Sequence, residues 1–218
     1  MTESAGKRCT HPVRLAFLCA GLIIMAFGVA FSIKAALGTL PISSVPYVTA
    51  RISGMSVDTT TIIMNFIFVL IQIGILRKQY QWFQLLQFPA AVLFGVMIDV
   101  AEAVLAPLPA GNYLQQWLLC AVGIVLIALG VSVEVMANLV TTAGEGIVLA
   151  ICKVFPVKFG NMKMAFDITL VCISIVLSLL FLGQLDGVRE GTVAAAVLVG
   201  QITKRFQPLM KALERAVL

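Results

Sequence analysis

Charge is scarce in this sequence. Only 11% of its 218 residues are Asp, Glu, Lys or Arg, whereas 61% are hydrophobic; a soluble domain carries about a quarter of its residues as charges. Several apolar runs approach or exceed the roughly 18 residues that mark a transmembrane helix. These runs are continuously apolar and lack the alternation that membrane β-strands show. The composition therefore predicts an all-α fold, a polytopic bundle of membrane helices.

Metal ligands and catalytic motifs are also missing. His11 is the only histidine, and the five cysteines lack the spacing of metal ligands, so no metal site and no cofactor are expected. The motifs HExxH and GxSxG and a phosphate-binding loop are absent, and we expect no enzyme activity. The net charge of +5 gives no support to nucleic-acid binding, because basic residues concentrate at one face of membrane proteins. The expected surroundings are a lipid bilayer.

Six apolar segments are predicted to cross the membrane, of which the last is the shortest. They lie at about 13–33, 57–76, 88–105, 113–135, 164–182 and 191–202. The first is too long for the core of a signal peptide and is interpreted as a retained helix. The crossings make one transmembrane domain at 13–206, between a cytoplasmic tail at 1–12 and a basic amphipathic cytoplasmic tail at 207–218. Pro208 is expected to break or kink that tail.

Two further apolar segments, at about 42–52 and 144–155, are too short to cross. Helices of their length span about 18–24 Å, against a hydrocarbon core of about 30 Å. We interpret them as broken or re-entrant half-helices, which are tolerated only where protein or a water-filled cavity surrounds them.

The chain also repeats itself. GVAFSIKAALGTLPISSVPY begins at Gly28, and a related stretch, GVSVEVMANLVTTAGEGIVLAI, begins at Gly130. The same offset of 102 residues pairs Gly21 with Gly123. We expect two repeats, at about 13–106 and 113–206. The glycines of each pair are seven residues apart on one helix face, which indicates close helix packing, with a solute pathway along the same faces as the alternative.

Three crossings in each half predict an inverted repeat, a construction common in secondary transporters. Both termini are then cytoplasmic, and only Lys34, Arg51 and Arg189 among the 15 Lys and Arg residues lie outside. If all eight segments cross, the repeats are parallel, and the bias of basic residues barely separates the two topologies.

The run LGTLPISSVPY at 37–47, with GVSVEVMANLVTTAGEG at 130–146, resembles the YitT/YczE-type family of bacterial integral membrane proteins. The resemblance covers about residues 12 to 206 and is closer to the shorter, YczE-like type. It implies a multi-pass protein of the bacterial inner (plasma) membrane, and it supplies neither a substrate nor catalytic residues.

Polar residues gather at the two breaks, where the N-termini of half-helices expose backbone N–H groups that can hold a solute. The candidate substrate-binding residues are Thr39, Ser43, Ser44, Glu134, Asn138, Thr141, Thr142 and Glu145. The alternative is helix capping alone, since 142–145 fits a capping box. The negative charge of Glu145 disfavours an anionic solute unless that charge is neutralised. A zwitterionic solute, a cation-coupled solute and a proton-linked step are therefore alternatives to an anion.

Other ionisable residues have more than one interpretation. Lys34 is either a counter-charge for the glutamates at the second break or a snorkelling lysine. Asp167, which corresponds to Asn65 by the repeat, is close to Lys158 and Lys163 and is expected in an interfacial ion pair rather than in a proton relay. Asp99 and Glu102 lie either deep in the membrane or at its outer interface.

These observations favour a small-solute transporter or permease with a central site between the broken helices, and a homodimer is plausible. The alternative is a non-transporting scaffold or regulator that acts on a partner protein through its basic cytoplasmic face and tail.

Overall fold

The computed structural model describes residues 10–109 and 111–217, which form helices and contain no strand. The long and intermediate helices are α1 (Thr10–Ala35), α2 (Pro41–Ser53), α3 (Val57–Leu76), α4 (Gln87–Leu105), α5 (Tyr113–Ala137), α6 (Ala143–Val154), α7 (Phe159–Leu177) and α8 (Glu190–Val217). Three short elements are η1 (Arg77–Gln79), η2 (Trp82–Leu86) and η3 (Ser178–Leu182). The all-α prediction is confirmed. Most of the predicted N-terminal tail, residues 1–9, lies outside the described residues.

Five helical stretches of the described chain are long and apolar enough to cross a membrane: Pro12–Ala35, Val57–Gln79, Trp82–Leu105, Tyr113–Ala137 and Phe159–Leu182. They coincide with the first five predicted crossings. The helices α2 and α6 have 13 and 12 residues, as the sequence predicted, and are too short to span the roughly 30 Å hydrocarbon core.

The C-terminal helix differs from the prediction. The helix α8 runs for 28 residues through Pro208, whereas the sequence predicted a crossing that ends near 202 and a tail that this proline breaks or kinks. Proline removes one backbone hydrogen bond, but Met210 beyond it is buried against Val133 and Met136 of α5. This packing holds the helix together, so the predicted tail is part of the bundle.

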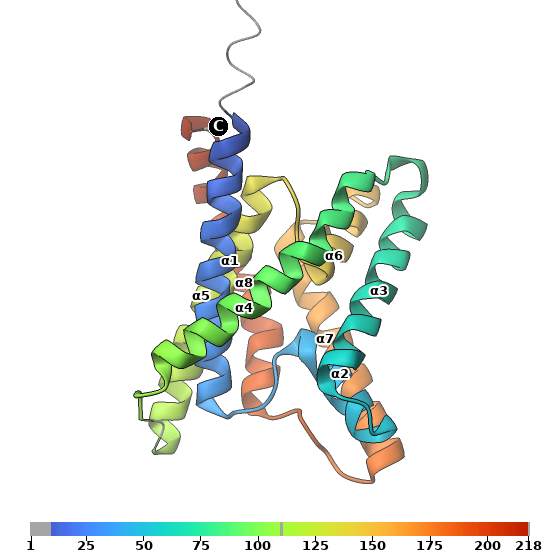
Figure 1. The fold of residues 1–218 in the computed structure, drawn as a ribbon, viewed down its shortest axis with the longest axis vertical. Helices are drawn as coiled ribbons and strands as arrows, with labels where there is room; N and C mark the ends of the chain where they lie inside the picture. The colour runs from blue at the N-terminus through green and yellow to red at the C-terminus, as the bar shows by residue number, and fades with distance from the viewer. Residues whose placement is uncertain (1–9, 110, 218) are drawn as a thin grey trace, which may run out of the picture.

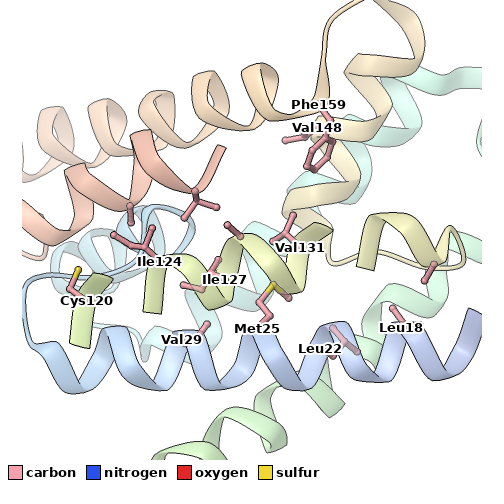
Figure 2. Packing of buried hydrophobic residues seen from close by; sticks show 14 of the residues in the cluster. Leu18, Leu22, Met25, Val29, Cys120, Ile124, Ile127, Val131, Val148 and Phe159 are labelled. Carbon is pink, nitrogen blue, oxygen red and sulfur yellow. The ribbon is translucent and has the colours of Figure 1, made fainter. Parts of the chain in front are cut away.

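The core lies between α1 and α5, which pack closely through glycines. A Cβ atom on Gly28 would lie 2.7 Å from the backbone nitrogen of Ile127, and one on Gly130 would lie 2.7 Å from that of Met25. Such distances leave no room for a side chain, so the predicted packing through small residues is confirmed. Figure 2 shows the apolar side chains that line this contact from both helices.

The remaining helices flank this pair. The helix α4 packs on α1 and α8 packs on α5, while α2 and α6 each contact both α3 and α7. The helix α8 also packs on α7, where the Cβ of a residue replacing Gly160 would lie 2.5 Å from the carbonyl oxygen of Gly200. By contrast, α4 runs obliquely across the front of the bundle and makes no comparable contact with α3 (Figure 1).

Candidate functional site

A cavity of about 350 Å³ lies among the helices, and every one from α1 to α8 contributes to its lining. The polar side chains that line it are Ser43, Asp58, Thr61, Asn65, Thr142, Glu145, Lys163 and Asp167. The other lining is mainly apolar and includes Met25 and Val29 of α1 and Phe94 and Ile98 of α4. The cavity therefore has a polar side formed by the short helices with α3 and α7, and an apolar side formed by α1 and α4.

A buried ion network forms part of the polar side. The Nζ atom of Lys163 lies 3.0 Å from Oε1 of Glu145 and 2.9 Å from Oδ1 of Asp167. The three side chains are only 3–6% exposed. Charges at such depth are costly unless they are paired. The network links the first turn of α6 to α7, and one ammonium group serves two carboxylates.

The start of α6 differs from the predicted capping box. Thr142 is the N-cap residue, but its side chain makes no capping bond to the backbone. Its Oγ1 instead donates to Oε2 of Glu145, whose other oxygen binds Lys163. The capping box is wrong because the nearby ammonium group gives the carboxylate a charged partner. Glu145 therefore takes part in a tertiary contact.

Glu134 lies beside this network and outside the cavity lining. Its Oε1 accepts a hydrogen bond of 2.6 Å from the backbone N–H of Thr142. The side chain is fully buried, and Oε2 has no hydrogen-bond partner within the described part of the chain. Glu134 thus positions the N-cap residue of α6 from the side of α5.

The candidate residues of the sequence occupy different places. Ser43, Thr142 and Glu145 line the cavity. Thr39 and Ser44 bind backbone groups instead: Oγ1 of Thr39 donates to the carbonyl of Gly187 over 2.9 Å, and Oγ of Ser44 donates to that of Pro41 over 2.7 Å.

Asn138 and Thr141 do not line the cavity. Asn138 ends α5 in a left-handed conformation, with φ of 47°, and its side chain is exposed. Thr141 lies in the connection to α6 and is partly exposed.

Lys163, which the sequence offered with Lys158 only as a partner of Asp167, lies in the candidate site. The predicted ion pair of Asp167 with a nearby lysine is confirmed, and both side chains are buried within the protein. The helix α7 begins at Phe159, earlier than the predicted 164. Lys163 therefore lies inside the helix, one turn before Asp167. The i, i+4 spacing was the available signal.

Three ionisable residues that the sequence singled out, Lys34, Asp99 and Glu102, lie outside the cavity lining. Lys34 donates to the carbonyl of Ala106 over 2.9 Å and so joins the ends of α1 and α4; the counter-charge of Glu145 is Lys163. Asp99 and Glu102 are exposed on α4. The described residues contain no group of three or more His, Cys, Asp or Glu side chains placed to hold a metal ion.

Comparisons with known proteins identify relatives without an assigned activity. Residues 12–208 match the model of DUF6198, a family of unknown function. The chain is 29% identical to "Uncharacterized membrane protein YczE" of Bacillus subtilis (strain 168), over 90% of this chain and 86% of that protein. No solved structure matches significantly. The YczE side of the resemblance is confirmed, and the link to YitT stays a prediction.

Proposed function

We propose that this chain, which belongs to the membrane protein family DUF6198, is a transporter or permease for a small solute that binds in the central cavity. The observation that carries this proposal is that both halves of the chain line the cavity at matching positions. No catalytic role is assigned to the lining residues.

The proposal includes an inverted repeat. The helix α2 begins at Pro41 and α6 at Ala143, and α3 begins at Val57 and α7 at Phe159, an offset of 102 in each case. The packing partners correspond as well, since α4 lies on α1 as α8 lies on α5.

The two short helices support the inversion because they approach opposite ends of α3. The carbonyl of Pro46 in α2 accepts a hydrogen bond from Thr60, near the start of α3. Ala150 in α6 packs against Leu76 and Tyr80, at and just beyond the end of α3. Inverted halves of this kind place a solute site where their broken helices meet.

The matching positions give the cavity two unlike walls. Glu145, Lys163 and Asp167 of the second half correspond at the same offset to neutral polar residues of the first half. These counterparts are Ser43, Thr61 and Asn65, and all six side chains line the cavity. One wall is therefore charged and the other is polar and neutral, which supports a site that orients its solute.

The halves also differ in one helix contact. Gly160 and Gly200 bring α7 and α8 together, whereas their counterparts Asp58 and Ile98 both line the cavity. In the proposed cycle, α4 closes on α3 while α8 separates from α7, so that access alternates. Oxidation of a variant with cysteines at positions 58 and 98, and no other cysteine, should then form a cross-link that solute promotes. No cross-link under any condition would argue against this cycle.

The proposal places the protein in the bacterial cell (inner) membrane with both termini in the cytoplasm. The beginning of α1 and the end of α8 lie at the same end of the bundle (Figure 1), which supports this arrangement. A homodimer and the absence of nucleic-acid partners also belong to the proposal.

The test is uptake by purified protein in liposomes, with a panel of amines, amino acids, carboxylates and sugars. Gly95 lines the cavity, and a Cβ atom there meets nothing within 4 Å, so Gly95→Leu should fill the cavity and abolish uptake. Gly74 has equally open surroundings outside the lining, and Gly74→Leu is the matched control. The proposal fails if wild type moves no solute of the panel, or if Gly95→Leu transports as well as wild type.

A further inference from the structure

We infer that the solute is an organic monocation, a protonated amine with an apolar body. This inference rests on the proposed function and concerns the same cavity. It is carried by the charge balance of the lining, by one free carboxylate oxygen, and by the apolar wall opposite.

The ionisable side chains of the lining have an excess of acid. Asp58, Glu145 and Asp167 line the cavity, but Asp58 is exposed to solvent, so the buried excess is a single negative charge: two carboxylates against Lys163, the only basic lining residue among the described residues. The ammonium group of Lys163 is engaged with both Glu145 and Asp167, so it is poorly placed to bind an anion. In a region of low dielectric, an uncompensated negative charge strongly favours a cation over a neutral or anionic solute.

Within the buried ion network, Asp167 has one carboxylate oxygen available to the solute. Both oxygens of Glu145 are engaged, one by Lys163 and the other by Thr142. Asp167 uses Oδ1 for Lys163, and Oδ2 takes part in no hydrogen bond or ion pair within residues 10–109 and 111–217. Since Asp167 lines the cavity, this oxygen is an acceptor for an N–H group of an ammonium ion.

The neutral wall provides further acceptors. Asn65 corresponds to Asp167 by the repeat, and it lines the cavity with Ser43 and Thr61. An amide oxygen and two hydroxyl groups can accept the other N–H groups of a primary amine without adding charge. A single positive charge therefore suits the site.

The rest of the lining favours an organic cation over Ca²⁺ or Mg²⁺. These two ions take six or more oxygen ligands, whereas Met25, Phe94 and Ile98 present apolar atoms. These side chains suit the hydrocarbon part of an amphiphilic cation. Burial of that part contributes about 25 cal/mol of favourable binding free energy per Å² of apolar surface. The volume of about 350 Å³ is at the small end of ligand pockets, so the body is about the size of one ring.

Three probes that share an apolar body and differ in charge test the inference: phenylethylammonium, phenylethanol and phenylacetate. Their binding to the purified full chain in detergent is measured by calorimetry. We expect the cation to bind at least about tenfold more tightly than the alcohol, the difference that one charge-assisted hydrogen bond supplies. Asp167→Asn should weaken binding of the cation by about tenfold and leave binding of the alcohol unchanged. Asp99→Asn, an exposed carboxylate outside the lining, is the control.

A second variant keeps the test decisive if Asp167→Asn does not fold. Asn65→Asp adds a carboxylate on the neutral wall and leaves the ion network intact, so it should strengthen binding of the cation by about tenfold. The inference is overturned if phenylacetate binds more tightly than the cation, if none of the probes binds, or if Asn65→Asp weakens binding of the cation. Tight binding of the cation that depends on Asp167, without uptake in liposomes, would support the inference and contradict transport.

Discussion

Replacing Lys163 by methionine should destabilise the protein more than any other single loss of charge. The substitution keeps the aliphatic stem and removes the ammonium group that lies 3.0 Å from Glu145 and 2.9 Å from Asp167. Two carboxylates are then left without their cation in side chains that are only 3–6% exposed. Loss of one partner of a buried ion pair costs about 3–5 kcal/mol. For a protein of this size, that cost lowers Tm by roughly 6–20 °C.

The same reasoning predicts a rescue. The triple variant Glu145→Gln, Lys163→Met, Asp167→Asn retains the shapes of the side chains and removes all three charges. Buried ion networks are often replaced by neutral groups of similar volume without loss of stability. The triple variant should therefore unfold within about 1 kcal/mol of wild type, or at a higher temperature.

The assay is thermal unfolding of the purified protein in detergent, followed by circular dichroism. Lys211→Met on α8, where the side chain is exposed, is the matched control and should change stability by less than about 0.5 kcal/mol. A loss below about 1 kcal/mol for Lys163→Met, or a triple variant no more stable than the single one, would refute the reasoning.

Three further substitutions test the helix packing and a surface ion pair. Gly28→Ala places a Cβ 2.7 Å from the backbone of Ile127 and should lower the free energy of unfolding by about 1–3 kcal/mol. The control is Gly74→Ala, where the added Cβ meets nothing within 4 Å, and it should be neutral or slightly stabilising. Equal values for the two variants would contradict the close packing of α1 and α5. Pro208→Ala restores a backbone donor inside α8 and should raise Tm; a lower Tm would show that the proline is required. Asp186→Asn, which breaks an ion pair of 3.1 Å with the 59%-exposed side chain of Arg51, should cost under about 1 kcal/mol in the same assay, and a larger loss would mean that the pair is not screened.

Much of the fold could be predicted from local patterns. The run 57–76 has the length and apolarity of a crossing, and the helix α3 has these bounds. The short segments at 42–52 and 144–155 became α2 and α6, with ends shifted by only one residue. Hydrophobic length fixes such elements because every backbone group in lipid must be hydrogen-bonded within the helix.

The candidate site was predicted only in part. Ser43, Thr142 and Glu145 lie in the lining, as a site at the two breaks requires. The sequence placed Lys163 just before the crossing predicted at 164–182, as a candidate partner of Asp167. Its actual partners come from α6 and α7. The i, i+4 spacing signals the contact with Asp167 within α7, but the contact with Glu145 joins two helices and leaves no local signal.

The sequence by itself determined the membrane class and the lengths of helices such as α2, α3 and α6. These properties follow from composition and from hydrogen bonding along single helices. Only the tertiary structure decided which polar residues share one cavity, that α8 continues through Pro208, and that α7 meets α8 while α4 lies apart from α3. Those features depend on packing between helices. The ammonium group of Lys163 binds carboxylates on α6 and α7, and Met210 packs the part of α8 beyond Pro208 against α5.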